Sequence, residues 1–138
     1  SLTSVGNTAL LSSIQGNAFY GCTNLNYVYM PDTVTDIEAS AFWGCEKLTN
    51  IELSSNLEKI SSCAFGYCKS LQSITIPASV NNIDIDIEDA IYDAIFKGCT
   101  NLKEVNIKKE SPLLVNGEVP QELATKLGVD KSKIKIVD

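Results

Sequence analysis

The chain has 138 residues, of which 44% are hydrophobic and 20% are charged, so it is bounded to one modest domain with a continuous apolar core. Its 11 cations are all lysines and face 17 Asp and Glu residues, a net charge of −6. An acidic chain without arginine is a poor candidate for binding nucleic acid. The absence of histidine removes the commonest general base and most zinc sites. No apolar run approaches the roughly 20 residues of a membrane helix, so we expect no membrane insertion.

A five-residue motif of the form Ala-Phe-x-Gly-Cys recurs along the chain. Its copies occupy residues 18–22, 41–45, 64–68 and 95–99. The first three copies are evenly spaced, from Cys22 to Cys45 to Cys68, whereas the repeat that leads to Cys99 carries an eight-residue insertion. A fixed period within the range of roughly 20–50 residues is typical of a solenoid, in which each repeat forms one coil.

Apolar columns follow each motif at fixed offsets. A leucine three residues after each cysteine opens an L-x-x-I-x-I pattern, at Leu25, Leu48, Leu71 and Leu102. Leu2 and Val5 stand one full repeat before Leu25 and Val28, which places the start of the chain in the same register. Two further columns are Leu11, Val34, Leu57 and Val80, then Ile14, Ile37, Ile60 and Ile83. The pattern predicts a short strand in each repeat, stacked into a parallel sheet over one core.

These columns resemble the BspA-like leucine-rich repeats, whose unit is similar to L-x-x-I-x-I-P-x-x-V-x-x-I-x-x-x-A-F-x-x-C. The resemblance covers about residues 2–107. It implies a surface or secreted protein of a bacterium or a parasitic protist, and several members are linked to adhesion to host or bacterial partners. The third motif departs from the Ala-Phe-x-Gly-Cys pattern in two ways. Tyr67 replaces the glycine, and Gly66 stands one place before it.

The insertion lies within residues 84–93, a segment that is acidic. Its carboxylates are Asp84, Asp86, Glu88, Asp89 and Asp93. A calcium loop of the EF-hand type needs glycine at its sixth and glutamate at its twelfth position, where this chain has Asp89 and Ile95. The alternation of isoleucine and aspartate through Ile87 instead predicts a strand with one solvated face.

The repeats end at Ile107, so we divide the chain into a solenoid at residues 1–107 and a cap at residues 108–138. Asn116 and Gly117 predict a turn, Pro120 begins a helix that runs to Leu127 with Gly128 as its stop, and residues 133–137 predict a short strand. The N-terminus has no equivalent cap. We therefore expect an open first coil, further repeats upstream in the natural protein, and end-to-end self-association through that coil.

Four of the five cysteines share one repeat column, and Cys63 lies outside it. A column spreads its side chains along an axis, whereas a zinc site needs ligands that converge, and parallel side chains do not face each other as a disulfide requires. We therefore expect buried free thiols that pack as small hydrophobes, with no metal and no cofactor.

Catalysis by paired carboxylates is a poor fit. The outward strand positions offer Glu52 and Glu104, two strand spacings or about 10 Å apart, which is too far for a retaining glycosidase and marginal for an inverting one. A short solenoid also lacks a deep pocket, so we expect that the chain is not an enzyme.

The outward face of the predicted sheet is the candidate binding site. Its residues are Tyr27, Tyr29, Asn50, Glu52, Ser73, Thr75, Glu104 and Asn106. The two tyrosines beside Asn50 and Glu52 suit an interface, because tyrosine offers a large contact area and a hydrogen-bonding group. The alternative is an ordinary solvated sheet, in which aromatics serve as good strand formers. A second aromatic pair, Tyr20 and Trp43, either packs over neighbouring turns or marks another contact surface.

The sequence thus predicts an α/β leucine-rich-repeat solenoid, with a short parallel sheet on one face, irregular turns on the other, and a small C-terminal α/β cap. For function we favour a non-enzymatic module that binds a protein or glycan, for example a host or matrix protein. The family resemblance places it outside the cell or at its surface, although no signal peptide is visible in the chain. The acidic charge favours basic or neutral partners. The alternative is a structural spacer without a ligand of its own.

Overall fold

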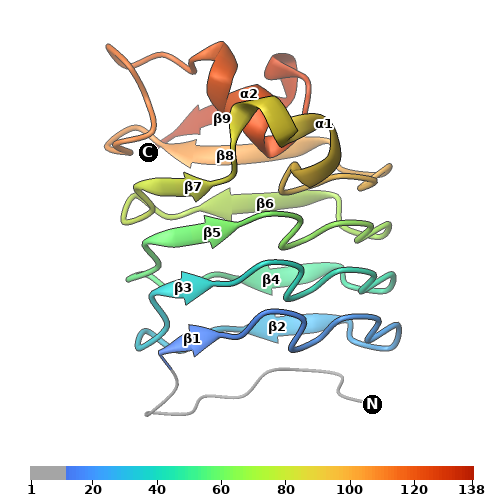
Figure 1. Ribbon diagram of the computed structural model, residues 1–138. Coiled ribbons are helices and arrows are strands. Elements are labelled where there is room, and N and C mark those ends of the chain that lie inside the picture. Colours follow the sequence, from blue (N-terminus) through green and yellow to red (C-terminus); the bar gives the residue numbers. More distant parts are fainter. Residues whose placement is uncertain (1–11) are drawn as a thin grey trace.

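The structure is a computed structural model that describes residues 12–138, and it is a solenoid of stacked coils (Figure 1). This confirms the predicted leucine-rich-repeat architecture. The first predicted coil, which contains Leu2 and Val5, lies outside the described residues, and so does its expected open edge. None of the helices within residues 12–138 is long and apolar enough to cross a membrane.

One side of the solenoid carries the predicted strands. They are β2 (Tyr27–Tyr29), β4 (Asn50–Glu52), β6 (Ser73–Ile76) and β8 (Glu104–Lys108), and β9 (Ile134–Val137) of the cap follows β8. All their pairings are parallel, and Val28 lies beside Ile51, which holds the same position in the next repeat. Leucines of the L-x-x-I-x-I pattern are buried beneath this side, among them Leu25, Leu48 and Leu71.

The opposite side is more regular than the irregular turns that the sequence predicts. It carries a second parallel sheet in the order β1-β3-β5-β7, formed by β1 (Ser13–Ile14), β3 (Asp36–Ile37), β5 (Lys59–Ser61) and β7 (Asn82–Asp84). Because the isoleucine column recurs once in every coil, Ile14, Ile37, Ile60 and Ile83 lie side by side in register. Turns join these short strands to the Ala-Phe-x-Gly-Cys motif of each coil.

Phenylalanines from successive motifs stack along the core. The ring centroids are 5.2 Å apart for Phe19 and Phe42, 5.3 Å for Phe42 and Phe65, and 5.8 Å for Phe65 and Phe96. Phe42, Phe65 and Phe96 are buried. Stacked rings of this kind contribute beyond the area they bury, so the motif holds neighbouring coils together.

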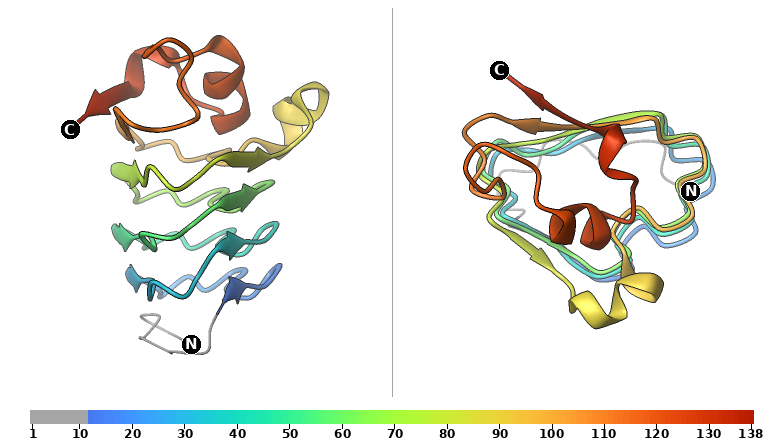
Figure 2. Two further views of the ribbon diagram at one scale, coloured as in Figure 1. Left: turned by 90° about the vertical axis from the view of Figure 1, so that its left-hand side faces the viewer. Right: turned by 90° about the horizontal axis from the view of Figure 1, so that it is seen from above.

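The acidic insertion leaves the solenoid as a helical protrusion, and the predicted strand through Ile87 is wrong. The strand β7 ends at Asp84, and the 3-10 helix η1 (Ile87–Asp89) and the helix α1 (Ala90–Asp93) follow. The Asp86 carboxylate accepts a hydrogen bond from the Glu88 N–H at 3.1 Å, which caps the helical turn and competes with an extended backbone. Figure 2 shows this segment projecting beyond the outline of the stacked coils.

The cap has the predicted helix and strand. The helix α2 (Gln121–Leu127) starts after Pro120 and ends at Gly128, whose φ of 75° is the left-handed conformation typical of a helix stop. A 3-10 helix, η2 (Lys131–Lys133), leads into β9. The carbonyl of Leu127 accepts the N–H of Phe96 at 3.0 Å, so the end of α2 continues the stack of coils above the last motif.

Candidate binding face

The eight predicted site residues lie on the strands β2, β4, β6 and β8, and they alternate with inward residues that are buried, except for the half-buried Ile51. The outward residues of β2, β4 and β6 are exposed, whereas Glu104 and Asn106 on β8 are half-buried. Tyr27 is 37% exposed and Tyr29 is 39% exposed, while Val28 between them is fully buried. We call this surface the binding face.

The structure brings together the groups that the sequence analysis paired. In the parallel register of β2 and β4, Tyr27 lies beside Asn50 and Tyr29 beside Glu52. Ser73 and Thr75 lie beside Glu104 and Asn106, and the Asn106 side-chain amide donates to the Thr75 hydroxyl at 3.4 Å. Two clusters result, one on β2 and β4 and the other on β6 and β8.

The two clusters are separated by an interruption of the sheet. The strands β4 and β6 belong to different sheets, although the coils that carry them are consecutive. On the opposite side of the solenoid the same coils remain paired through β3, β5 and β7. The solenoid is therefore continuous, and the opening is confined to the binding face.

A groove of about 390 Å³ lies at this interruption. Four predicted residues line it: Asn50, Glu52, Ser73 and Thr75. The other lining residues are Thr49, Ile51, Leu53, Ser55, Ile74, Pro77 and Lys108. The register places both tyrosines next to the groove and places Glu104 and Asn106 across Ser73 and Thr75 from it. The groove offers hydroxyl, amide, carboxylate and ammonium groups, and its volume is within the range of small ligand pockets.

Sequence reasoning missed the lysines at this face. It ended the last repeat at Ile107, but β8 continues to Lys108, which lines the groove. Lys135 of β9 lies in register beside Asn106 and is exposed. Both lysines were detectable as polar positions that alternate with Ile107, Ile134 and Ile136.

The second aromatic set forms a ladder on the motif side of the coils. Tyr20 and Trp43 stack with ring centroids 6.1 Å apart and an angle of 5° between the planes. The ring centroids of Trp43 and of Tyr67 in the next coil are 4.6 Å apart, and the two ring planes are tilted by 55°. Trp43 is half-buried, which agrees with packing over the neighbouring turns.

All five cysteines are free thiols, and each of the three buried thiols that follow Cys22 in the column has a carbonyl partner. Cys45 donates to the Phe19 carbonyl at 3.3 Å, and Cys68 and Cys99 make the equivalent bond to the phenylalanine of the coil before. Burial raises the pKa of Cys45 to about 12 and also raises the pKa of Cys63. Neutral buried thiols are poor nucleophiles and poor metal ligands. No group of three or more Cys, Asp or Glu residues within the described part of the chain could hold a metal ion.

Three solved structures of leucine-rich-repeat proteins resemble the chain. A leucine-rich cell-surface protein of Faecalibacterium prausnitzii matches 99% of the chain with 26% identity and a TM-score of 0.72, and a protein of Bacteroides ovatus matches 91% with 30% identity and a TM-score of 0.69. A protein of T. pallidum matches 75% with 26% identity and a TM-score of 0.54. The chain spans 32%, 28% and 56% of these three proteins, respectively. No curated protein sequence matches the chain.

The repeat itself matches a known family model. The model for the BspA-type leucine-rich repeat region matches residues 1–111 in six copies, which is most of the chain. The repeat columns, the parallel coils and the similar structures agree with this match. The chain therefore belongs to the BspA-type leucine-rich repeat family.

Proposed function

We propose that the chain is a non-enzymatic binding module that holds a protein or glycan partner on its binding face. The observation that carries the proposal is the groove between β4 and β6, where the sheet is interrupted beside two exposed tyrosines. A spacer needs only continuous stacking. An opening lined by polar side chains is a feature that a ligand can use.

The groups around the groove suit recognition by hydrogen bonds and aromatic contact. The side chains of Asn50, Ser73 and Thr75 line the groove with hydrogen-bond donors and acceptors. Tyr27 and Tyr29 supply a rigid surface with hydroxyl groups at its edge, which suits the face of a sugar ring or a side chain of a protein.

The charges on the binding face favour some classes of partner over others. Glu52 is exposed at the groove, Glu104 is half-buried on β8, and the whole chain has a net charge of −6. Lys108 and Lys135 supply local positive charge at the cap end of the face. A neutral glycan or a protein with a basic patch therefore fits the tyrosine end better than an anionic partner does.

A location outside the cell or at its surface agrees with this function. The similar protein of Faecalibacterium prausnitzii is described as a leucine-rich cell-surface protein. For the present chain, we propose the same location, where host or matrix proteins and glycans are the available partners.

Biolayer interferometry against a panel of extracellular-matrix proteins and neutral glycans tests the proposal. We expect saturable binding to at least one member, and we expect Glu52→Lys to weaken it. Glu46→Lys is the matched control, because it makes the same charge change on an exposed turn that is outside both the binding face and the acidic insertion. Absence of binding, or equal effects of the two substitutions, would contradict the proposal and favour a structural spacer.

A further inference from the structure

The sheet opposite the binding face ends at β7 on the side of the cap. Its order is β1-β3-β5-β7, so β7 pairs with β5 on one side, and no strand of the described residues pairs with its other side. On the binding face, by contrast, β9 of the cap covers the equivalent edge of β8. The cap therefore completes one sheet and leaves the other open.

Within β7, Ile83 is the residue whose backbone groups face this open side. The Asn82 N–H donates to the Glu58 carbonyl at 3.2 Å, toward the β5 side. Because successive residues of a parallel strand direct their backbone groups to opposite sides, the N–H and carbonyl of Ile83 face the open edge. The carbonyl accepts the Ile85 N–H at 3.0 Å, so the N–H of Ile83 is the donor that an added strand would meet first.

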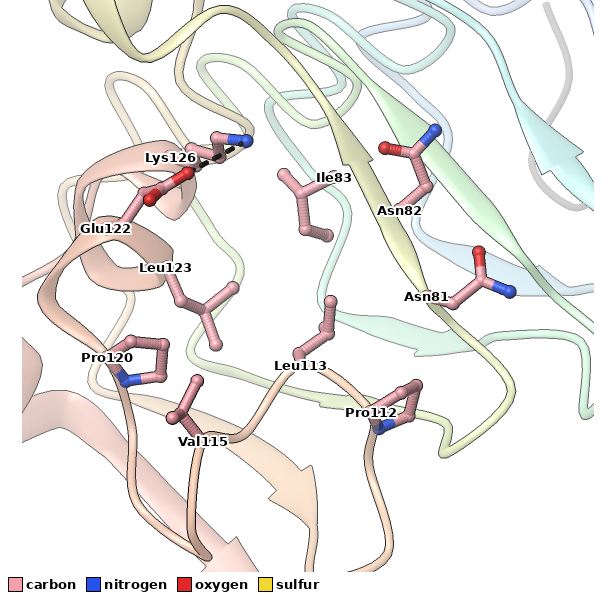
Figure 3. Close-up of a pocket in the computed structure, with 10 residues that line it drawn as sticks. All are labelled: Asn81, Asn82, Ile83, Pro112, Leu113, Val115, Pro120, Glu122, Leu123 and Lys126. Atoms are coloured by element: carbon pink, nitrogen blue, oxygen red, sulfur yellow. Dashed lines mark ion pairs between the residues drawn. The ribbon is translucent and has the colours of Figure 1, made fainter.

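A cavity of about 300 Å³ lies between this edge and the cap (Figure 3). The side chains of Ile83, Leu113 and Leu123 point toward its interior in that view, from β7, the loop before α2, and α2. Val115 also lines the cavity and is nevertheless 58% exposed. The cavity is thus open to solvent, lies directly beside β7, and is lined by both apolar and polar side chains.

The charged groups around the edge are mainly acidic. Asp84 is exposed at the end of β7, and Asp86 and Glu88 follow it in the insertion. On the cap, Glu122 lines the cavity together with Lys126. The Glu122 carboxylate lies 3.4 Å from the Lys126 Nζ, so the positive charge of Lys126 is neutralised by this ion pair. A cationic ligand is therefore favoured here.

We propose that the β7 edge and this cavity form a second binding site, which takes an extended peptide segment of a partner protein with alternating apolar and basic residues. The segment adds a strand to β7, inserts one apolar side chain between Leu113, Val115 and Leu123, and places its cations near Asp84. Backbone hydrogen bonds supply affinity in this mode, and the cavity supplies specificity. The site goes beyond the proposed function, because it lies on the other sheet and uses none of the groove residues.

Nuclear magnetic resonance with a synthetic peptide tests this site. The probe is a capped peptide of alternating valine and lysine, titrated into the isotope-labelled chain. We expect chemical-shift changes at residues 81–84 and 113–115, and slower hydrogen exchange of the Ile83 amide. A control peptide with methyl groups on alternate backbone nitrogens keeps the side chains, but the methyl groups hold its backbone away from the Ile83 N–H, so it should bind at least about tenfold more weakly.

Two surface variants locate the site. Val115→Lys places a cation at the cavity and should weaken binding of the basic peptide about tenfold. Ile136→Lys is the matched control on β9, where Ile136 is 43% exposed, and it should bind the peptide as the unmodified chain does. The proposal is overturned if the peptide does not bind, if the methylated peptide binds equally well, if Val115→Lys has no effect, or if the shifts map to the binding face.

Discussion

The indole of Trp43 lies against Gly66 of the next coil, in the place that a Cβ on residue 66 would occupy. This contact explains why the third motif departs from the pattern. The glycine stands one place early to admit the Trp43 ring, and Tyr67 takes the motif's usual glycine position with a φ of 54°. Tyr67 in turn packs against Gly98, where a Cβ would overlap the Tyr67 ring. Glycine is thus needed at both positions, because aromatic rings of the ladder occupy the space that a side chain would take.

The first prediction concerns this contact. Gly66→Ala should lower the free energy of unfolding by about 1–3 kcal/mol, because the added methyl group overlaps the indole. Urea unfolding followed by circular dichroism measures the change. In a Trp43→Ala background the same substitution should cost much less. An equal loss of unfolding free energy in the two backgrounds would show that the Trp43 indole is not the reason for glycine at position 66.

The second prediction concerns the phenylalanine stack. Phe42 is fully buried between Phe19 and Phe65, so Phe42→Ala should cost about 3–5 kcal/mol of stability. Ile91→Ala is the control, because Ile91 is 73% exposed and its truncation should stay within about 0.5 kcal/mol. A loss below about 1 kcal/mol for Phe42→Ala in urea melts would contradict its place in the core.

The third prediction compares two glycines with the same backbone angle. Gly117 and Gly128 both have a φ of 75°, but a Cβ would meet nothing at Gly117 and would overlap the Ala94 side chain at Gly128. Alanine at Gly117 should therefore cost about 1–2 kcal/mol, from the left-handed backbone alone. Alanine at Gly128 should cost clearly more in thermal or urea unfolding. Similar losses at both positions would mean that the cap does not pack on Ala94 as described.

The fourth prediction is a pH dependence. Burial raises the pKa of Cys45 from 9.0 to about 12, so between these values the folded chain keeps a proton that the unfolded chain releases. The stabilising contribution of this thiol is complete below pH 9 and is lost as the pH rises toward 12, by about 1 kcal/mol at pH 10. Urea unfolding of the chain and of Cys45→Ala at pH 8 and pH 10 measures it, and the variant should lose less stability between the two. An equal loss in both chains would contradict this origin.

The sequence was sufficient for the parts of the fold that depend on repetition. Leu25, Leu48 and Leu71 recur at one spacing, and a strand of that length buries its apolar side only by stacking, so coils and sheet follow from the columns. The cap helix was equally predictable, since Pro120 and Gly128 mark its two ends by their backbone preferences.

Two other features were beyond the reach of the pattern. The insertion alternates Ile85 and Ile87 with aspartates, which suits a strand, but the local bond from Glu88 to Asp86 favours a helical turn. The interruption between β4 and β6 leaves no mark on the sequence, because Ile51 and Ile74 occupy the same repeat column as Val28 and Val105. The sequence therefore predicted that four of the groove residues lie on one outward face of a sheet, but it did not predict the groove between β4 and β6.

The most direct test of the central claim is biolayer interferometry of the Tyr27→Ala/Tyr29→Ala double variant against the matrix proteins and glycans that the unmodified chain binds. Tyr92→Ala serves as the control, because Tyr92 is 69% exposed but belongs to the insertion. Loss of saturable binding in the double variant, with unchanged urea stability and normal binding by the control, is the result that a ligand site on the binding face predicts. Full binding by the double variant, or no binding by the unmodified chain, would contradict it.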